Sequence, residues 1–381
     1  MRALRIALAG SALLLCVAVI AVPGTPVGSL GRWGTDHCAH YGASVMFWHD
    51  GLAVFDTPMR DLCGARTPEG LAFAAYMQVP ERYVCERPGE RPLVINWQAY
   101  PRPYPPGALV YAAPEAVLYT QTALSVYAVN RIAIVKDILV GHLLVLVLLE
   151  MLLAGGEWRR WSVLLVPVVY LGVVPWAAAG FYDPLAVLCL VWAVARLERE
   201  RPLDALLFLS LAAFLHFRAI WYVPLGVVTV AKLRLADLRT WRAALAALLL
   251  GAAVLALVLV APYLNDFPHT NPILMTRLKV SAARIDYVVL FALVGACLLL
   301  QRQWLLATLV GWQGAIIGLT VQTQFWHPMF LLPLLAVARW KRAKWPTLAA
   351  LLLLVIGVAR IVYKTLPMIS AFASDVIHVN I

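Results

Sequence analysis

Charged residues are scarce in this sequence: only 13% of its 381 residues are Asp, Glu, Lys or Arg, whereas 62% are hydrophobic. So little charge cannot cover the surface of a soluble protein of this size. The mean hydropathy of +0.81 agrees with this conclusion. These values exclude a soluble globular protein and predict an all-α, polytopic integral membrane protein.

The sequence motifs of common soluble enzymes are also absent. The chain has no Walker loop, no dinucleotide-binding glycine fingerprint, no serine nucleophile elbow and no cysteine pair at zinc-ligand spacing. Lysine is rare, with 6 residues against 25 arginines, a ratio that fits a GC-rich bacterial genome. The net charge of +11 requires no nucleic-acid partner, because arginines flanking spans on the cytoplasmic side give the same total.

One long polar segment, from Pro23 to Pro106, interrupts the apolar runs. It holds eight acids and seven arginines, so its formal charge is −1 (seven minus eight) in a chain of +11. Cys38, Cys63 and Cys85 also lie here, and one pair could form a disulfide in an oxidising compartment, although the sequence does not say which pair. We expect any chemistry of the protein to take place against this segment.

The distribution of positive charge predicts the topology. Arg2 and Arg5 precede the first apolar run, which places the N-terminus in the cytoplasm and residues 23–130 outside. We interpret residues 1–22 as a retained span, because the sequence that follows Ala21 is a weak signal-peptide cleavage site. Residues 107–127 are expected to form a helix on the external membrane surface, since a span there would move the basic residues 157–161 outside.

About eleven spans follow from these choices. Residues 1–381 would form one domain, with an external segment 23–130, a transmembrane bundle 131–362 and an external tail 363–381. The expected spans are 1–22, 132–153, 162–178, 183–197, 203–216, 219–232, 243–261, 286–301, 304–320, 327–339 and 346–362. Several are shorter than the roughly 20 residues that a bilayer requires, so some must extend into polar flanks or be broken.

Polar residues gather where the expected spans reach the external side. They are His216, Arg218, Lys279 and His327, with Arg131 at the start of the second span. Cationic groups at membrane depth are unfavourable without an anionic partner, and a lipid-linked phosphate is one such partner. In the alternative interpretation, the arginines snorkel towards water and the histidines make structural hydrogen bonds.

Several sequence elements share the layout of a known superfamily. They are Asp36-His-Cys-Ala-His-Tyr41 after the first span, Tyr100-Pro-Arg-Pro-Tyr-Pro-Pro-Gly107, Arg131-Ile-Ala-Ile-Val-Lys-Asp137, Leu215-His-Phe-Arg-Ala-Ile-Trp-Tyr-Val-Pro224 and His327-Pro-Met-Phe-Leu-Leu-Pro333. With one long external segment and about eleven spans, the chain resembles the GT-C superfamily of polyprenyl-phosphate-sugar-dependent glycosyltransferases, in particular bacterial phosphatidylinositol-mannoside and eukaryotic GPI mannosyltransferases. No paired Asp-x-Asp or Asp-Glu follows the first span, so metal use and the exact substrate stay open.

The resemblance implies transfer of a sugar, mannose first, from a polyprenyl-phosphate donor to a lipid or glycan acceptor at the external face of a bacterial inner membrane. Asp36 would be the general base and Asp50 the reserve base, and one displacement with one base inverts the anomeric carbon. The residues expected at the donor phosphate are Arg218, His216, Arg131, His327 and Lys279. The residues expected at the sugar and acceptor are His40, Tyr41, Trp48, Trp97 and Tyr104.

Each of these roles has a structural alternative. Asp36 would also serve as a helix N-cap with His40 one turn later, and the aromatic residues would also form an interfacial belt. A transporter or flippase of a lipid-linked or small anionic solute is the other function considered, with His142 and Glu150 as its main mid-span ionisable residues. A membrane scaffold would need no acidic segment. The expected partners are the donor, the acceptor and the bilayer, without a cofactor, a dedicated metal site or nucleic acid.

Overall fold

The computed structural model describes residues 2–21, 106–124, 126–153, 162–178, 183–216, 219, 222–264 and 285–300, together with 302, 304, 307–308 and 311–312. These residues form helices and the turns and short connections between them, and none of them lies in a strand. Three stretches are long and apolar enough to cross a membrane: Arg2–Ala21, Arg131–Met151 and Trp241–Val258. The all-α class is confirmed for the described residues, which have the character of a membrane protein, and the count of eleven spans stays a prediction.

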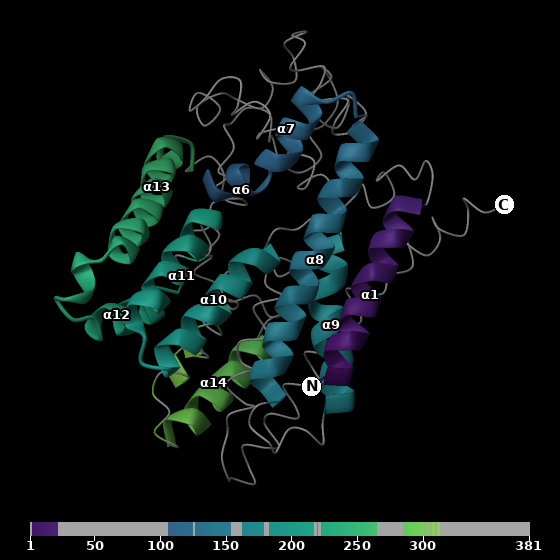
Figure 1. Cartoon of the computed structure of the whole chain (residues 1–381). Helices are drawn as coiled ribbons and strands as arrows, with labels where there is room; N and C mark the ends of the chain where they lie inside the picture. Colours follow the sequence, from purple (N-terminus) through teal and green to yellow (C-terminus); the bar gives the residue numbers. More distant parts are fainter. Residues whose placement is uncertain are drawn as a thin grey trace, which may run out of the picture.

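The described helices follow the apolar runs along the chain (Figure 1). They are α1 Arg2–Ala21, α6 Pro106–Tyr111, α7 Ala113–Gln121, α8 Val126–Leu153, α9 Ser162–Ala178, α10 Asp183–Glu198, α11 Pro202–Leu215, α12 Val223–Ala231, the 3-10 helix η6 Asp237–Arg239, α13 Trp241–Leu264 and α14 Ile285–Leu300. The helix expected over 162–178 coincides with α9. The expectations for 327–339 and 346–362 lie outside the described residues, and so does most of 304–320.

The helix expected over 107–127 differs in the structure, because two short helices occupy this part of the chain. Tyr111 ends α6, Ala113 begins α7, residues 122–124 are not helical, and α8 starts at Val126. Pro114 explains the first break, since its ring collides with the carbonyl four residues earlier and it has no N–H to donate. Gly107 and its neighbours in α6 are buried against other helices, so α6 is a packed element and not a helix lying free on a surface.

Two contacts show that α1 and α8 run antiparallel. Arg5, near the start of α1, forms an ion pair with Glu150 near the end of α8, at 2.5 Å. At the other end of the pair, the Arg131 guanidinium of α8 donates a hydrogen bond to the Ile20 carbonyl, at 3.2 Å. The chain from 22 to 105 therefore leaves α1 and returns to α6 at one end of the bundle, which we call the loop end.

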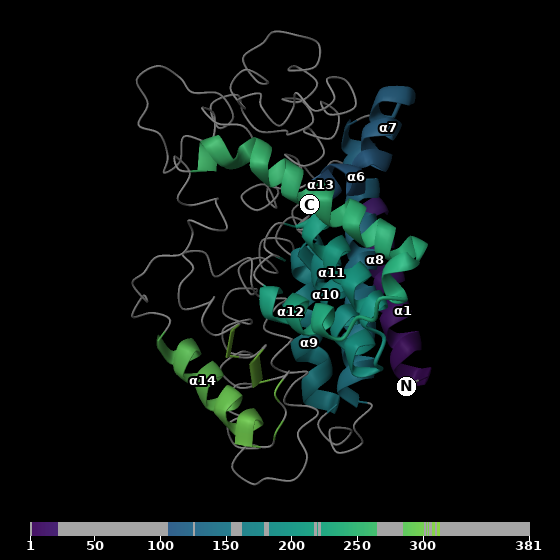
Figure 2. The same cartoon turned by 90° about the vertical axis from the view of Figure 1, so that its left-hand side faces the viewer.

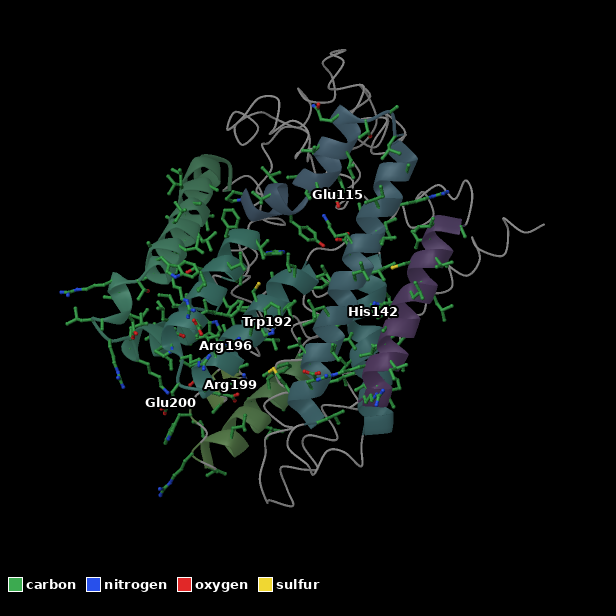
Figure 3. The ribbon with its side chains drawn as sticks, viewed as in Figure 1. Glu115, His142, Trp192, Arg196, Arg199 and Glu200 are labelled. Carbon is green, nitrogen blue, oxygen red and sulfur yellow. The ribbon has the colours of Figure 1, made fainter. Side chains whose placement is uncertain are left out.

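At the opposite end, where the N-terminus lies (Figure 1), Figure 3 labels Arg196 and Arg199, and Arg201, Lys232, Arg234 and Arg242 line a pocket there. A tight turn joins α10 to α11 there, with Glu200 in the left-handed region at a φ of 55°. The backbone N–H of Arg201 closes this turn by donating to the Arg196 carbonyl at 2.9 Å. The structure brings residues 196–201 and 232–242 to one end of the helices. The sequence places both segments on the same side of the membrane.

Close packing at small residues holds the central helices together. α8 packs against α1, α9 and α10, and α11 packs against α10 and α13. A Cβ added at Gly141 of α8 would lie 2.7 Å from the Ala177 side chain of α9, so only glycine permits this approach. Figure 2 shows α13 crossing over α11 at an inclination to α8, so that α11 lies between α10 and α13.

Candidate functional site

Four polar side chains form a cluster at the loop end of the bundle: Tyr111, Glu115, Lys136 and Asp137. We call it the loop-end cluster. The Lys136 ammonium of α8 lies 2.8 Å from the Glu115 carboxylate of α7 and donates to the Tyr111 carbonyl at 2.6 Å. The same ammonium lies 3.7 Å from the centre of the Tyr111 ring. The Tyr111 hydroxyl in turn donates to Asp137 Oδ1 at 2.5 Å.

Both carboxylates of the cluster are buried, with 1% of Glu115 and 2% of Asp137 exposed. A buried carboxylate is strongly destabilising unless a cation or hydrogen-bond donors face it. Here Lys136 faces Glu115, and the Tyr111 hydroxyl donates to one oxygen of Asp137. These contacts join α6 and α7 to the N-terminal half of α8. Figure 3 labels Glu115 at this end, far from the labelled residues Arg199 and Glu200.

Burial shifts the protonation equilibria of the cluster. Burial raises the pKa of Glu115, and the neighbouring Lys136 offsets only part of that rise. The pKa of Tyr111 is also raised, first by burial and then by the negative charge of Asp137. Tyr111 therefore stays protonated over the whole physiological range and acts as a permanent donor to Asp137.

A second polar network lies at the middle of the bundle, where α1, α8 and α9 meet. Its central residue is His142, of which 5% is exposed (Figure 3). His142 Nδ1 donates to the Ile138 carbonyl at 2.8 Å, and Nε2 lies 3.3 Å from the Tyr170 hydroxyl and 3.4 Å from Ser11 Oγ. Since Nδ1 carries the proton of a neutral ring, Nε2 accepts from one of these hydroxyls. The network ties three helices together by side-chain hydrogen bonds.

Only two of the residues expected from sequence to bind substrate lie in the described part of the chain. Arg131 lies at the loop end, with Nη1 on the Ile20 carbonyl. His216 is buried at the end of α11, where its backbone N–H donates to the Ala212 carbonyl. The other candidates lie outside the described residues: Asp36, His40, Tyr41, Trp48, Asp50, Trp97, Tyr104, Arg218, Lys279 and His327.

The sequence interpretation missed the loop-end cluster, although its charged members were visible. Glu115, Lys136 and Asp137 are isolated charges in apolar segments, and such charges need partners at membrane depth. That signal was sufficient to propose that the segment 107–127 packs onto the second span. Tyr111 carried no signal, because tyrosine is common at interfaces for other reasons.

Among the described residues, no group of three or more His, Cys, Asp or Glu side chains is arranged to hold a metal ion. Cys16 and Cys189 are free and buried, and the three cysteines of the polar segment lie outside the described residues. No protein-family model, curated protein or solved structure matches the chain.

Proposed function

We propose that this protein is a membrane glycosyltransferase that moves a sugar from a polyprenyl-phosphate donor to a lipid or glycan acceptor. The loop-end cluster is the observation that supports this proposal most. It fixes α6 and α7 against α8 at the end where residues 22–105 leave and rejoin the bundle. Such anchoring gives the acidic segment a rigid base, which positioning of a catalytic acid requires.

In the proposed reaction, the acceptor hydroxyl attacks the anomeric carbon of the donor sugar while the bond from that carbon to the phosphate oxygen breaks. The polyprenyl phosphate leaves with the bonding electrons, and Asp36 takes the hydroxyl proton. In this proposal Arg218 would neutralise the leaving phosphate, together with His216 and Arg131 at the loop end. A single displacement of this kind inverts the anomeric carbon.

Asparagine at position 36 tests the proposal, because asparagine caps a helix about as well as aspartate but cannot accept the proton. We expect Asp36→Asn to melt like the parent in detergent and to transfer no sugar from a panel of radiolabelled polyprenyl-phosphate sugars. The matched variant Asp50→Asn should retain most activity. A general base usually contributes roughly a hundredfold to ten-thousandfold in rate, so activity of Asp36→Asn within a few-fold of the parent would contradict the assignment.

A transporter or flippase is the second candidate, and the His142 network favours it. Buried ionisable groups in mid-span often mark a solute or proton pathway. Glu150, the other mid-span candidate, pairs with Arg5 and has a structural explanation. Movement of a polyprenyl-phosphate sugar across protein-containing liposomes, without any transfer of the sugar to an acceptor, would favour the transporter over the glycosyltransferase.

A further inference from the structure

A charged pocket of about 600 Å³ lies at the N-terminal end of the bundle, opposite the loop-end cluster. It is built by the turn between α10 and α11, the connection from α12 to η6 and the first turn of α13. Its lining residues are Glu200, Arg201, Pro202, Leu203, Asp204, Lys232, Arg234, Asp237 and Arg242. Glu200 marks its position in Figure 3. We call it the basic pocket, because its four cations and three acids give a formal charge of +1 (four minus three).

Two of the acids in the basic pocket already have partners. Arg242 Nη1 lies 2.7 Å from Asp204 Oδ1, and this ion pair joins the start of α13 to the start of α11. Asp237 Oδ2 accepts a hydrogen bond from the Arg234 backbone N–H at 2.9 Å, which shapes the connection before η6. These contacts hold the walls of the pocket in place.

Three cations remain available to a ligand: Arg201, Lys232 and Arg234. All three are exposed, and none of them has an anionic partner within the residues that the structure describes. They come from two separate segments, so the fold and not the local sequence brings them to one pocket. Exposed guanidinium and ammonium groups that converge in this way suit a phosphate oxygen, which accepts several charge-assisted hydrogen bonds.

Apolar side chains beside the pocket indicate whether its ligand is a soluble anion or a membrane lipid. Leu235, Leu238 and Trp241 are 83%, 54% and 68% exposed, and they alternate with arginines along the same connection. Exposed leucine and tryptophan beside cations are typical of a segment that inserts at a membrane interface. A soluble anion would gain nothing from these side chains, whereas a lipid would lay its acyl chains against them.

We propose that the basic pocket binds the phosphodiester of an anionic phospholipid, with Leu235, Leu238 and Trp241 inserted in the same leaflet. The formal charge of +1 matches the single negative charge of a phosphodiester such as that of phosphatidylglycerol. Glu200, which also lines the pocket, disfavours more highly charged polyphosphates. This inference is independent of the proposed transferase activity, because the pocket lies at the other end of the bundle.

A titration of the purified full chain in non-ionic detergent with fluorescent phosphatidylglycerol tests the proposal, with phosphatidylcholine as the comparison lipid. The pocket variant replaces the three available cations: Arg201→Gln, Lys232→Gln and Arg234→Gln. The control variant replaces three exposed arginines at the same end that do not line the pocket: Arg2→Gln, Arg199→Gln and Arg239→Gln. Each of the three pocket cations would donate a charge-assisted hydrogen bond to the bound phosphodiester, worth about tenfold in affinity, so we expect the pocket variant to lose at least about a hundredfold. The control variant should bind within a few-fold of the parent.

Three results would overturn the inference. They are equal binding of the two lipids by the parent protein, equal loss of affinity in the pocket and control variants, and competition by inorganic phosphate at the same concentration as the lipid. The last result would assign the pocket to a soluble phosphate. If the pocket variant fails to fold, Arg201→Lys with Arg234→Lys keeps the charge but loses the planar fork, and it should weaken binding only several-fold.

Discussion

Lys136 is the residue on which the loop-end cluster depends, because its single ammonium group serves three partners. It faces the Glu115 carboxylate, the Tyr111 carbonyl and the Tyr111 ring. The Arg5–Glu150 pair is a useful contrast, since 61% of the Arg5 side chain and 37% of the Glu150 side chain are exposed. Exposed pairs contribute little to stability, whereas loss of one partner from a buried pair leaves an uncompensated charge.

We therefore expect Lys136→Met to destabilise the fold by about 3 kcal/mol, because Glu115 would remain buried without its cation. Arg5→Met is the matched control and should cost less than about 1 kcal/mol. Thermal melting in detergent measures both. The double variant Lys136→Met with Glu115→Gln should recover part of the loss, and failure to recover any would mean that Lys136 acts through packing alone.

The pH dependence of stability gives a separate test at Glu115. Its folded-state pKa is raised above the ordinary value of 4.5. At a pH between these two pKa values, the folded state holds a proton that the unfolded state has lost. This group therefore lowers stability as pH rises from 4.5 through the raised pKa, and it has no effect at lower pH. Glutamine at position 115 does not titrate. The melting temperature of Glu115→Gln relative to that of the parent should therefore increase as pH rises through this window. Parallel melting curves over the window would contradict the raised pKa.

At the scale of helices, the apolar runs and their polar flanks were enough to predict most positions. The run at 183–197 begins at Asp183 and is followed by Glu198, and α10 spans Asp183–Glu198. The run at 162–178 coincides with α9. Pro114 also indicates a helix break in this segment, because proline has no N–H to donate within a helix. The isolated charges indicate that residues 107–127 pack onto the second span, but they do not identify Glu115 as the partner of Lys136, because that depends on how α7 lies beside α8.

Gly107 tests whether α6 is a packed element. A Cβ at this position would lie 2.4 Å from the Phe214 carbonyl oxygen and 2.7 Å from Leu215 Cα, and backbone atoms cannot move aside as a side chain can. Gly107→Ala should therefore destabilise the protein by about 1–3 kcal/mol through overpacking.

Gly251→Ala in α13 is the control for this change, because nothing lies within 4 Å of the added Cβ. It should be neutral or stabilising by up to about 1 kcal/mol, as alanine favours helix. The melting temperatures of Gly107→Ala and Gly251→Ala, measured under the same conditions, test this difference. Equal melting temperatures would mean that α6 is not held against the end of α11.

For the whole molecule, the two ends of the bundle differ in the kind of charge they carry. The loop end has the buried acids Glu115 and Asp137, which contact Lys136 and Tyr111, whereas the N-terminal end has exposed cations in the basic pocket and along residues 232–242. Exposed positive charge is retained on the cytoplasmic side during membrane insertion. The asymmetry therefore predicts that the N-terminal end faces the cytoplasm and the loop end faces outward.

Single-cysteine labelling tests this orientation with one position at each end. In a background without native cysteines, Thr122→Cys lies between α7 and α8 at the loop end, and Arg199→Cys lies in the turn between α10 and α11. Both native side chains are exposed, so access to a reagent depends on the membrane and not on packing. A membrane-impermeant maleimide applied to intact cells should modify position 122 alone, and inverted vesicles should show the opposite result. Modification of both positions from the same side would mean that the bundle does not separate its two ends across the bilayer, and the topology built on the positive charge would be wrong.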